Sequence, residues 1–319
     1  MTSFPALSKK ECVDVLLGLT SPTVVMHKRP DGDTVGTAIA LIRIFEAMGI
    51  RANYLCEDEI PERLRFLFDG EAVATTVTEA VCVDVASPAQ AGDILNSIPS
   101  PVLSIDHHEK NTPFAPHYTA GGKSSAAEVV MEICEELEKM GKLTLTKRIA
   151  EPLYAAISSD TGRFCYSSAT AKTHIRVARL LETGIDAARI NHLLFNSKSE
   201  SVLRAEGYSL ANMKTASDGK IAYTVISRDT LSGIGLDISD FESAIDVIRT
   251  LRGTSVAMIV KETEPHKFKA SLRSTSADVA SVASLFGGGG HKLAAGCTVE
   301  AESAEAAAKT LLSHLIPLV

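Results

Sequence analysis

One stretch of the sequence organises the rest of the chain: residues 23–36, which read TVVMHKRPDGDTVG. The apolar run at its start lies between Pro22 and Pro30 and predicts a short buried strand. From residue 35 onward apolar side chains recur at helical spacing until Gly49, so we expect a helix there. In open α/β sheets, ligands bind at the carboxyl ends of the strands. The loop between the strand and the helix is therefore a candidate site.

Three side chains of this loop can meet at one point: His27, Asp31 and Asp33. We expect the necessary turn to come from Pro30, Gly32 and Gly36. Taken singly, Asp31 is better explained as a helix N-cap and His27 as a core histidine with its hydrogen bonds satisfied. An EF-hand loop is excluded, because residue 35, at the next ligand position, is a valine. This stretch alone leaves metal binding and a structural role open.

Composition narrows the class of protein. A chain of 319 residues with 45% hydrophobic residues has room for two domains, each with its own core. A net charge of −7 argues against binding of long duplex nucleic acid, while a small anionic substrate remains compatible with it. No apolar run approaches the length of a membrane span, so we expect no membrane partner. The first residues show no export signal and the six cysteines form no CxxC pair, which predicts a reduced, cytoplasmic protein.

Acidic and imidazole side chains also accompany other predicted elements. Asp84 interrupts the apolar run 80–85, where an unpaired carboxylate would be costly to bury. The next apolar run, 101–105, ends in the triplet Asp106-His107-His108. A helix predicted over about 145–157 is followed by Asp160. The repeated placement of such residues behind apolar segments predicts that they gather at one edge of the sheet.

The chemistry of these residues points to divalent cations. The candidate ligands are oxygen or nitrogen donors without a cysteine: His27, Asp31, Asp33, Asp84, His107 and Asp160. Such a set suits Mn²⁺ or Mg²⁺ better than structural zinc. It is also larger than one ion with an open position needs, so we expect two ions that share a carboxylate, and we choose Asp84 as the bridge. A pair of this kind binds a phosphoryl group and activates water.

The second part of the chain predicts a smaller domain. We expect domain boundaries at 1–196 and 213–319, joined over 197–212 by a linking helix that is not a core element. Strands are predicted at 222–227, 255–261 and 267–273, with helices at 241–251, at 278–286 and from residue 303. Four consecutive glycines at 287–290 precede His291. They predict close approach of the backbone to a ligand, with a flexible loop as the alternative.

Together these residues carry a resemblance to a known family. The stretch from His27 to Asp33, the isolated Asp84, the triplet 106–108 and Asp160-Thr161-Gly162 resemble the four motifs of the DHH phosphoesterase superfamily. Residues 271–274 (SLRS) and 287–291 resemble its DHHA1 domain. The resemblance implies an α/β fold, in which a parallel-sheet DHH catalytic domain and a smaller α/β DHHA1 domain enclose an active site in the interdomain cleft. Length and arrangement are similar to the nanoRNase/pAp-phosphatase group.

The resemblance also implies roles for individual residues. One metal ion would bind His27, Asp31 and Asp84, and a second would bind Asp33, Asp84, His107 and Asp160. His108 would face the phosphate as a hydrogen-bond donor or an acid, with Asp106 orienting its neighbours. The substrate-binding residues would be Arg273, Gly288, Gly289, Gly290 and His291. Cys165 departs from relatives that often have a basic residue after the Phe of the Asp-Thr-Gly-x-Phe motif, and this bears on substrate preference.

The activity implied is Mn²⁺-dependent phosphoester hydrolysis with two ions, for which Mg²⁺ or another divalent cation could substitute. Substrates would be short oligonucleotides, cut to mononucleotides, and adenosine 3′,5′-bisphosphate, which would lose its 3′-phosphate. The alternatives are a cyclic-dinucleotide phosphodiesterase, an inorganic pyrophosphatase or polyphosphatase, and a non-catalytic nucleotide sensor. Arg273 taken alone is as well explained by an ordinary surface position. A homodimer is compatible with the sequence, although no interface can be identified in it.

Overall fold

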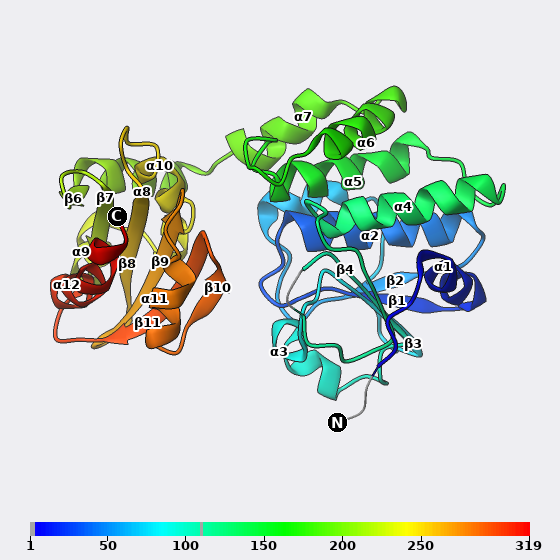
Figure 1. Ribbon diagram of the computed structural model, residues 1–319, viewed down its shortest axis with the longest axis horizontal. Coiled ribbons are helices and arrows are strands. Elements are labelled where there is room, and N and C mark those ends of the chain that lie inside the picture. The colour runs from blue at the N-terminus through cyan, green and yellow to red at the C-terminus, as the bar shows by residue number, and fades with distance from the viewer. Residues whose placement is uncertain (1–3, 109–110) are drawn as a thin grey trace. The chain divides into compact units, whose positions relative to one another are not determined.

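The computed structural model describes residues 4–108 and 111–319, with the side chain of His291 excepted. The chain divides into two compact units, Met1–Ser197 and Lys198–Val319. Each contains one sheet with helices packed against it, and each is described by itself (Figure 1). Of the helices formed by the described residues, none has the length and apolar content that crossing a bilayer requires.

The first unit is built on a five-stranded sheet in the order β2-β1-β3-β4-β5, with every neighbouring pair parallel. Its strands are β1 (Pro22–Val25), β2 (Asn53–Leu55), β3 (Glu79–Val83), β4 (Leu103–Asp106) and β5 (His117–Thr119). The parallel sheet predicted from the apolar runs is confirmed, and β5 was not predicted. Because β1, β3 and β4 are adjacent, their carboxyl ends lie side by side at one edge of the sheet.

Both faces of this sheet are buried, which explains why its strands have few polar residues. Alternate side chains point to opposite faces, so Val24 and Val81 join the large apolar cluster on the face covered by α1, α2 and α4, while Val25 and Cys82 face α3 (Figure 1). The helices of this unit are α1 (Lys9–Gly18), α2 (Gly32–Ala47), α3 (Pro88–Ala91), α4 (Ala126–Lys139), α5 (Lys147–Asp160), α6 (Ala171–Glu182) and α7 (Ala187–Asn191). Shorter helical turns are η1 (Glu62–Leu67), η2 (Asp93–Asn96) and η3 (His192–Asn196).

Helices α2 and α5 approach each other closely at two glycines. A Cβ atom on Gly36 would lie 2.5 Å from the carbonyl oxygen of Pro152, and one on Gly32 would lie 2.3 Å from Oγ of Ser159. Both glycines are inside α2, one helical turn apart. The expectation that Gly32 and Gly36 supply a turn after Pro30 was therefore wrong. These glycines remove side-chain bulk where two helix backbones meet.

The second unit contains a mixed six-stranded sheet in the order β10-β11-β9-β8-β7-β6, in which only β7 and β8 pair in parallel. Its strands are β6 (Lys214–Ala216), β7 (Ile221–Ile226), β8 (Val256–Glu264), β9 (Lys267–Ser274), β10 (Gly289–His291) and β11 (Ala294–Glu300). Its helices are α8 (Glu200–Ala211), α9 (Arg228–Ile234), α10 (Ala244–Ile248), α11 (Val279–Leu285) and α12 (Ala304–Leu315), with short turns η4 (Ile238–Phe241) and η5 (Ile316–Leu318). This confirms the predicted smaller second domain of strands and helices. Strands β6, β10 and β11 were not predicted.

Two expectations for this unit need correction. The stretch predicted as a linking helix outside either core forms α8, whose Ala205 is fully buried in an apolar cluster with Phe241 and Ile245. The single helix predicted over 241–251 is instead η4 followed by the short α10. Apolar spacing alone does not separate one helix from two short ones, because both bury the same residues.

Candidate metal centre

The candidate ligands of the first unit gather at the carboxyl edge of its sheet. His27 lies two residues after β1, Asp84 one residue after β3, and His107 directly after β4. Two helix ends add the remaining side chains: Asp31 and Asp33 stand at the start of α2, and Asp160 is the last residue of α5. The convergence follows from the fold, because adjacent parallel strands end together. Asp160 is carried there by the close packing of α5 on α2.

Asp84 lies at the centre of this group. It was predicted inside a strand, but β3 ends at Val83 and Asp84 follows in the left-handed conformation, with φ of 58°. Its N–H donates to the carbonyl of Ile105 (2.9 Å), which anchors the backbone to β4. The side chain is only 3% exposed, and no hydrogen bond to its Oδ1 is formed by the described residues. A buried carboxylate oxygen in that state calls for a cation.

The first cluster contains His27, Asp31 and Asp84, and one ligand atom from each lies within 4.8 Å of the others. The Nε2 atom of His27 is 3.5 Å from Oδ2 of Asp84 and 3.7 Å from Oδ1 of Asp31. Its Nδ1 is 2.8 Å from the carbonyl of Lys28, so a proton on Nδ1 leaves the Nε2 lone pair directed at the cluster. Asp31 also caps α2 by accepting from the N–H groups of Asp33 and Thr34. The two roles that the sequence offered for Asp31 are thus geometrically compatible.

The second cluster contains Asp33, His107 and Asp160, with the same spacing. From Nε2 of His107 the distances are 3.8 Å to Asp33, 3.6 Å to Asp160 and 3.4 Å to Oδ1 of Asp84. The Nδ1 atom of His107 is 3.3 Å from the carbonyl of Lys123. Asp84 therefore turns one carboxylate oxygen toward each imidazole: Oδ2 toward His27 and Oδ1 toward His107. This is the arrangement expected of a bridging carboxylate.

Asp106 and His108 form a pair beside the second cluster. Oδ1 of Asp106 lies 2.7 Å from Nδ1 of His108 and also accepts from the N–H of His107 (2.8 Å). Asp106 is 2% exposed, so its direction is fixed by these contacts. Burial lowers the pKa of His108, but the hydrogen bond to Asp106 and the charges of Asp84 and Asp106 together outweigh this and raise the pKa overall. His108, Asp84 and His107 form a third group with ligand spacing.

Charge in the metal-free site is balanced by protons. Burial lowers the pKa of both imidazoles, but the neighbouring carboxylates outweigh it and raise the pKa of His27 to about 11 and that of His107 to about 10. Burial raises the pKa of Asp33 well above its ordinary value and, with the charge of Asp84, raises that of Asp160 to about 7. Burial also opposes ionisation of Asp84, but the two imidazoles reverse this and lower its pKa.

This site fits divalent cations. Among the residues that the structure describes, no lysine or arginine forms an ion pair with any of its four carboxylates: Asp31, Asp33, Asp84 and Asp160. The imidazole-to-carboxylate distances of 3.4–3.8 Å exceed those of direct hydrogen bonds, which leaves space between the atoms. Carboxylate and imidazole donors suit Mn²⁺ or Mg²⁺. All six candidate ligands are thus brought together in two clusters joined through Asp84.

The predicted substrate residues lie in the second unit. Arg273 is on β9 and donates from Nη1 to the carbonyl of Leu272 (3.0 Å), and no carboxylate within the described part of the chain pairs with it. The glycine run is not an open loop, because Gly289 and Gly290 belong to β10 and pair with β11. A Cβ on Gly288 would lie 2.2 Å from the carbonyl oxygen of Gly296. Gly288 and Gly290, where a Cβ would meet the backbone of β11, thus have a packing role, and the side chain of His291 lies outside the described part.

Sequence reasoning missed the segment 123–127, which contributes backbone groups to the site. The N–H groups of Ala126 and Ala127 donate to Oδ2 and Oδ1 of Asp33 (2.7 and 3.2 Å). The carbonyl of Lys123 faces His107, as described above. The only signal in the sequence is that Ser125, the N-cap of α4, is a residue type that commonly begins a helix. Free N–H groups at a helix start favour a nearby carboxylate.

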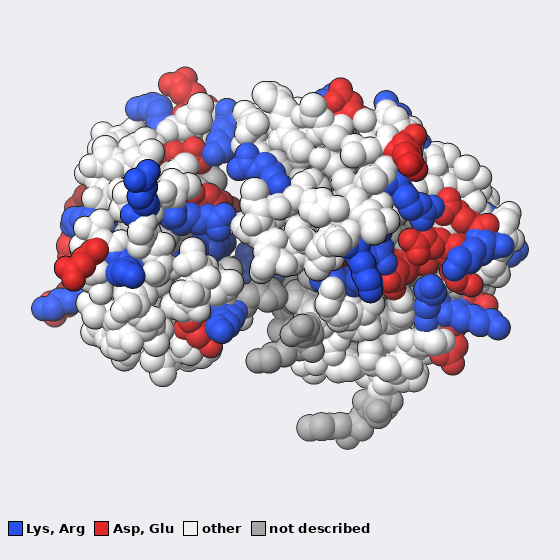
Figure 2. Space-filling view, turned by 45° about the horizontal axis from the view of Figure 1, so that its top comes forward, with Lys and Arg blue, Asp and Glu red and all other residues white. Residues whose placement is uncertain are grey.

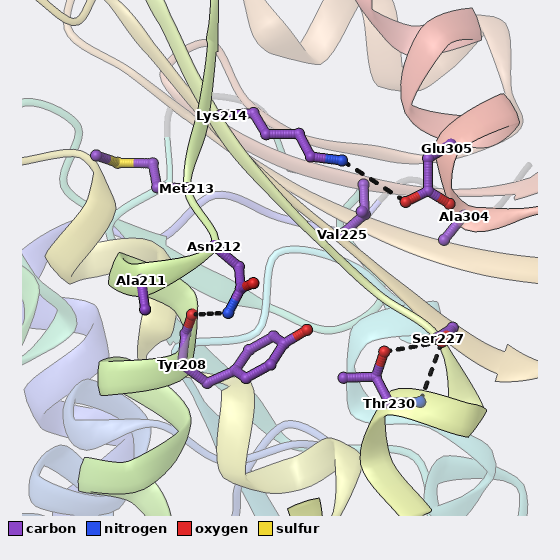
Figure 3. Close-up of a pocket in the computed structure, with 10 residues that line it drawn as sticks. All are labelled: Tyr208, Ala211, Asn212, Met213, Lys214, Val225, Ser227, Thr230, Ala304 and Glu305. Atoms are coloured by element: carbon purple, nitrogen blue, oxygen red, sulfur yellow. Dashed lines mark hydrogen bonds and ion pairs between the residues drawn. The ribbon is translucent and has the colours of Figure 1, made fainter. Parts of the chain in front are cut away.

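A cavity of about 380 Å³ lies elsewhere, in the second unit, and shares no lining residue with the metal centre (Figure 3). Tyr208 of α8 and Asn212, the C-cap of that helix, line one side, and Ser227 and Thr230 line another (Figure 3). Lys214 and Glu305 pair across its rim at 3.7 Å. A cavity with hydrogen-bonding side chains is a candidate for ligand binding, but the clustered carboxylates and imidazoles place the candidate chemistry in the first unit.

Solved structures share this fold. An exopolyphosphatase-related protein from Bacteroides fragilis superimposes with a TM-score of 0.87 at 23% identity, covering 97% of this chain and 96% of that one. Among curated proteins, the bifunctional oligoribonuclease and PAP phosphatase NrnA of Thermus thermophilus is 28% identical over 296 residues, which cover 90% of this chain and 87% of the relative. The NrnA protein of Bacillus subtilis is 25% identical over 283 residues, with 87% and 89% covered.

Family models match both units of the chain. The model described as the DHH family, N-terminal domain, matches residues 22–157, which include β1 through most of α5. The DHHA1 domain model matches residues 218–316, which span the sheet of the second unit from β7 onward. These two matches occur in the order expected from the motifs. The chain therefore belongs to the DHH family of phosphoesterases, with a DHHA1 domain following the DHH domain.

Proposed function

We propose that this protein hydrolyses short oligonucleotides to mononucleotides and removes the 3′-phosphate of adenosine 3′,5′-bisphosphate, using two Mn²⁺ ions or other divalent cations. The names of the NrnA relatives, which match over most of their own length, support this pair of substrates. Both reactions cleave a phosphoester bond, so a single centre that binds a phosphoryl group and activates water could serve both.

One observation carries the two-ion proposal: Asp84 directs its two carboxylate oxygens at two different imidazoles. We assign one ion to His27, Asp31 and Asp84. We assign the second to Asp33, Asp84, His107 and Asp160. Ligand-like spacing within the first set, and among Asp33, His107 and Asp160 of the second, supports the assignment, and Oδ1 of Asp84 lies 3.4 Å from Nε2 of His107. When bound, two such ions lower the pKa of water and stabilise the charge that develops on the phosphoryl oxygens.

The residues around the ions have separate tasks in this proposal. The carbonyl groups of Lys28 and Lys123 hold the two ligating imidazoles through Nδ1, so that Nε2 faces the centre. Asp106 orients His108 through Nδ1, and His108 gives a proton to the leaving oxygen of the substrate. The raised pKa of His108 supports this role, because it favours the protonated imidazole that can give up a proton.

We propose that the second unit selects substrates by their terminal phosphate. Arg273 has no carboxylate partner among the described residues, so its guanidinium can bind a phosphate with two parallel hydrogen bonds. Gly288, which precedes β10, and Gly289, Gly290 and His291 of β10 remain proposed phosphate contacts through their backbone groups. On the face that Figure 2 shows, basic side chains lie among acidic ones, which supports a short substrate over a long duplex.

Product analysis tests the proposal directly. Metal-free protein is supplied with MnCl₂ and offered a short RNA ladder, adenosine 3′,5′-bisphosphate, a cyclic dinucleotide and pyrophosphate in parallel, and the products are separated by chromatography. We expect mononucleotides from the short RNAs and phosphate from the bisphosphate, with both activities lost on chelation. Turnover of pyrophosphate alone, or tight binding of the cyclic dinucleotide without turnover, would contradict the proposal.

A further inference from the structure

A buried ion-pair network lies between α4 and α6. Arg176 of α6 is 9% exposed, and its guanidinium contacts two carboxylates of α4. Its Nη1 donates to Oε1 of Glu128 (3.2 Å), and its Nη2 donates to Oε1 of Glu132 (2.7 Å). Glu128 is 2% exposed. Such a pair is too deeply buried to be a surface ion pair of little consequence.

The two glutamates also hold the segment that leads into α4. Oε2 of Glu128 accepts from the N–H of Ser124 (2.8 Å). Oε1 of Glu132 contacts the Nζ atom of Lys123. Arg176 is thus connected to Ser124 through the carboxylate of Glu128 and to Lys123 through that of Glu132. Its planar guanidinium has the geometry to bind both carboxylates at once, which a lysine ammonium lacks.

The segment in turn holds two of the six candidate ligands. The N–H groups of Ala126 and Ala127 donate to both carboxylate oxygens of Asp33, and the carbonyl of Lys123 faces Nδ1 of His107. Both ligands belong to the second cluster.

The first cluster is held differently. His27 is oriented by the carbonyl of Lys28, and Asp31 by the backbone at the start of α2. Among the described residues, no hydrogen bond joins the segment 123–127 to His27 or Asp31. The network is therefore connected to one half of the metal centre.

We propose that Arg176 is a positioning residue for the second cluster, which it serves by fixing the segment 123–127 through Glu128 and Glu132. This inference rests on the two-ion centre proposed above. It means that the first and the second cluster are held in place by different parts of the chain. Partners of metal ligands fix the direction of the ligand lone pairs, and their loss typically weakens metal binding about 10–100-fold. Without Arg176, the buried Glu128 carboxylate loses its counter-charge, and its hold on Ser124 is weakened.

Arg179 provides a matched control on the same pair of helices. It lies one turn further along α6 and donates to Glu135 (3.3 Å) and Glu138 (2.7 Å) of α4. Glu138 also accepts from the N–H of Leu145, at the far end of α4 from the segment 123–127. Replacing Arg179 by Met therefore removes a two-carboxylate ion pair between α4 and α6 and leaves the metal centre untouched.

The test is a calorimetric titration of the full-length, metal-free protein with MnCl₂, with paramagnetic resonance of the bound ions as a second readout. The wild type is expected to bind two ions and to give the signal of a coupled pair. In Arg176→Met we expect one dissociation constant to rise about 10–100-fold while the other changes little, so that an isolated-ion signal appears at low metal. Arg179→Met should behave as wild type in both measurements.

A second pair of variants covers the case in which Arg176→Met folds poorly. Glu128→Ala frees the N–H of Ser124 and should weaken the same single site, whereas Glu128→Gln keeps an acceptor for that N–H and should restore most of the affinity. Wild-type affinity in both Arg176→Met and Glu128→Ala, or an equal loss at both sites, would overturn the inference. A wild-type protein that binds fewer than two ions would instead overturn the two-ion centre itself.

Discussion

Replacing Asp84 by asparagine is the sharpest perturbation of the candidate centre. The side chain keeps its size, and asparagine tolerates the left-handed conformation that Asp84 adopts at φ of 58°. Asp84→Ala is a poorer choice, because the left-handed conformation costs most residues about 1–2 kcal/mol. The asparagine variant therefore isolates the loss of one carboxylate from damage to the backbone between β3 and α3.

The expected effect is large because Asp84 is the one ligand that both halves of the proposed centre share. Its Oδ2 lies 3.5 Å from Nε2 of His27, and its Oδ1 lies 3.4 Å from Nε2 of His107. An amide offers a single neutral oxygen and presents N–H donors to the other position. If the loss of transition-state stabilisation is about 4 kcal/mol, kcat/KM falls about a thousandfold, since each 1.36 kcal/mol is about tenfold.

The assay is release of mononucleotides from a short RNA in the presence of MnCl₂, with metal content and melting temperature measured on the same samples. Asp106→Asn is the control, because Asp106 contacts His108 and the N–H of His107 but belongs to neither cluster. It should keep both ions and lose about 10–100-fold in kcat. If Asp84→Asn binds two ions and retains wild-type kcat/KM, the two-ion reasoning is refuted.

Three further predictions follow from other parts of the structure. In Arg273→Ala, kcat/KM for a short RNA should fall about 10–100-fold through KM, as for loss of charge-assisted hydrogen bonds to a phosphate; steady-state kinetics would show this, and an unchanged KM would contradict the assignment. Gly36→Ala should lower the free energy of unfolding by about 1–3 kcal/mol, because its Cβ would lie 2.5 Å from the carbonyl of Pro152, and a lower melting temperature would show this. The pKa values of His27 and His107 are raised to about 11 and 10, so the metal-free protein should lose stability as pH rises above about 6.5 toward those values. Over the same pH range Mn²⁺ affinity should rise, because protons cease to compete with the ion for the imidazoles. Thermal melts and metal titrations at several pH values check both trends. If stability and Mn²⁺ affinity changed in the same direction with pH, the two imidazoles would not be protonated in the metal-free protein.

The position of the candidate site could be predicted because it depends on which residues follow the strands in the sequence, and not on the distances between packed elements. His27, Asp84 and His107 each follow an apolar run, and the carboxyl ends of adjacent parallel strands meet at one edge. Polar residues at such positions can be predicted to lie together without any information on how the helices pack. The clustering of all six candidates in the structure agrees with that rule, while their assignment as metal ligands stays a prediction.

Other features depend on contacts that a one-dimensional pattern does not contain. The glycines of 287–290 were predicted to bring the backbone close to a ligand, with a flexible loop as the alternative. In the structure, Gly288 and Gly290 stand where a Cβ would meet the backbone of β11. Strand β10 is short and rich in glycine, so it has no alternation of apolar residues from which to predict it. Asp84 was predicted to be part of a strand because the apolar run continues to Val85. The left-handed conformation of a single residue cannot be recognised from such a run.

Asp160 shows most clearly where sequence reasoning ends. Its position in the site is set by the distance between α2 and α5, and that distance is set by Gly32 and Gly36. Both glycines were assigned to a turn, because glycine near a proline and two aspartates commonly marks one. Inside a helix, glycine instead costs about 1 kcal/mol relative to alanine. That cost is offset only where a second helix makes use of the missing side chain, as α5 does here. The two glycines therefore act on the metal centre through packing, by placing the last residue of α5 beside the first turn of α2.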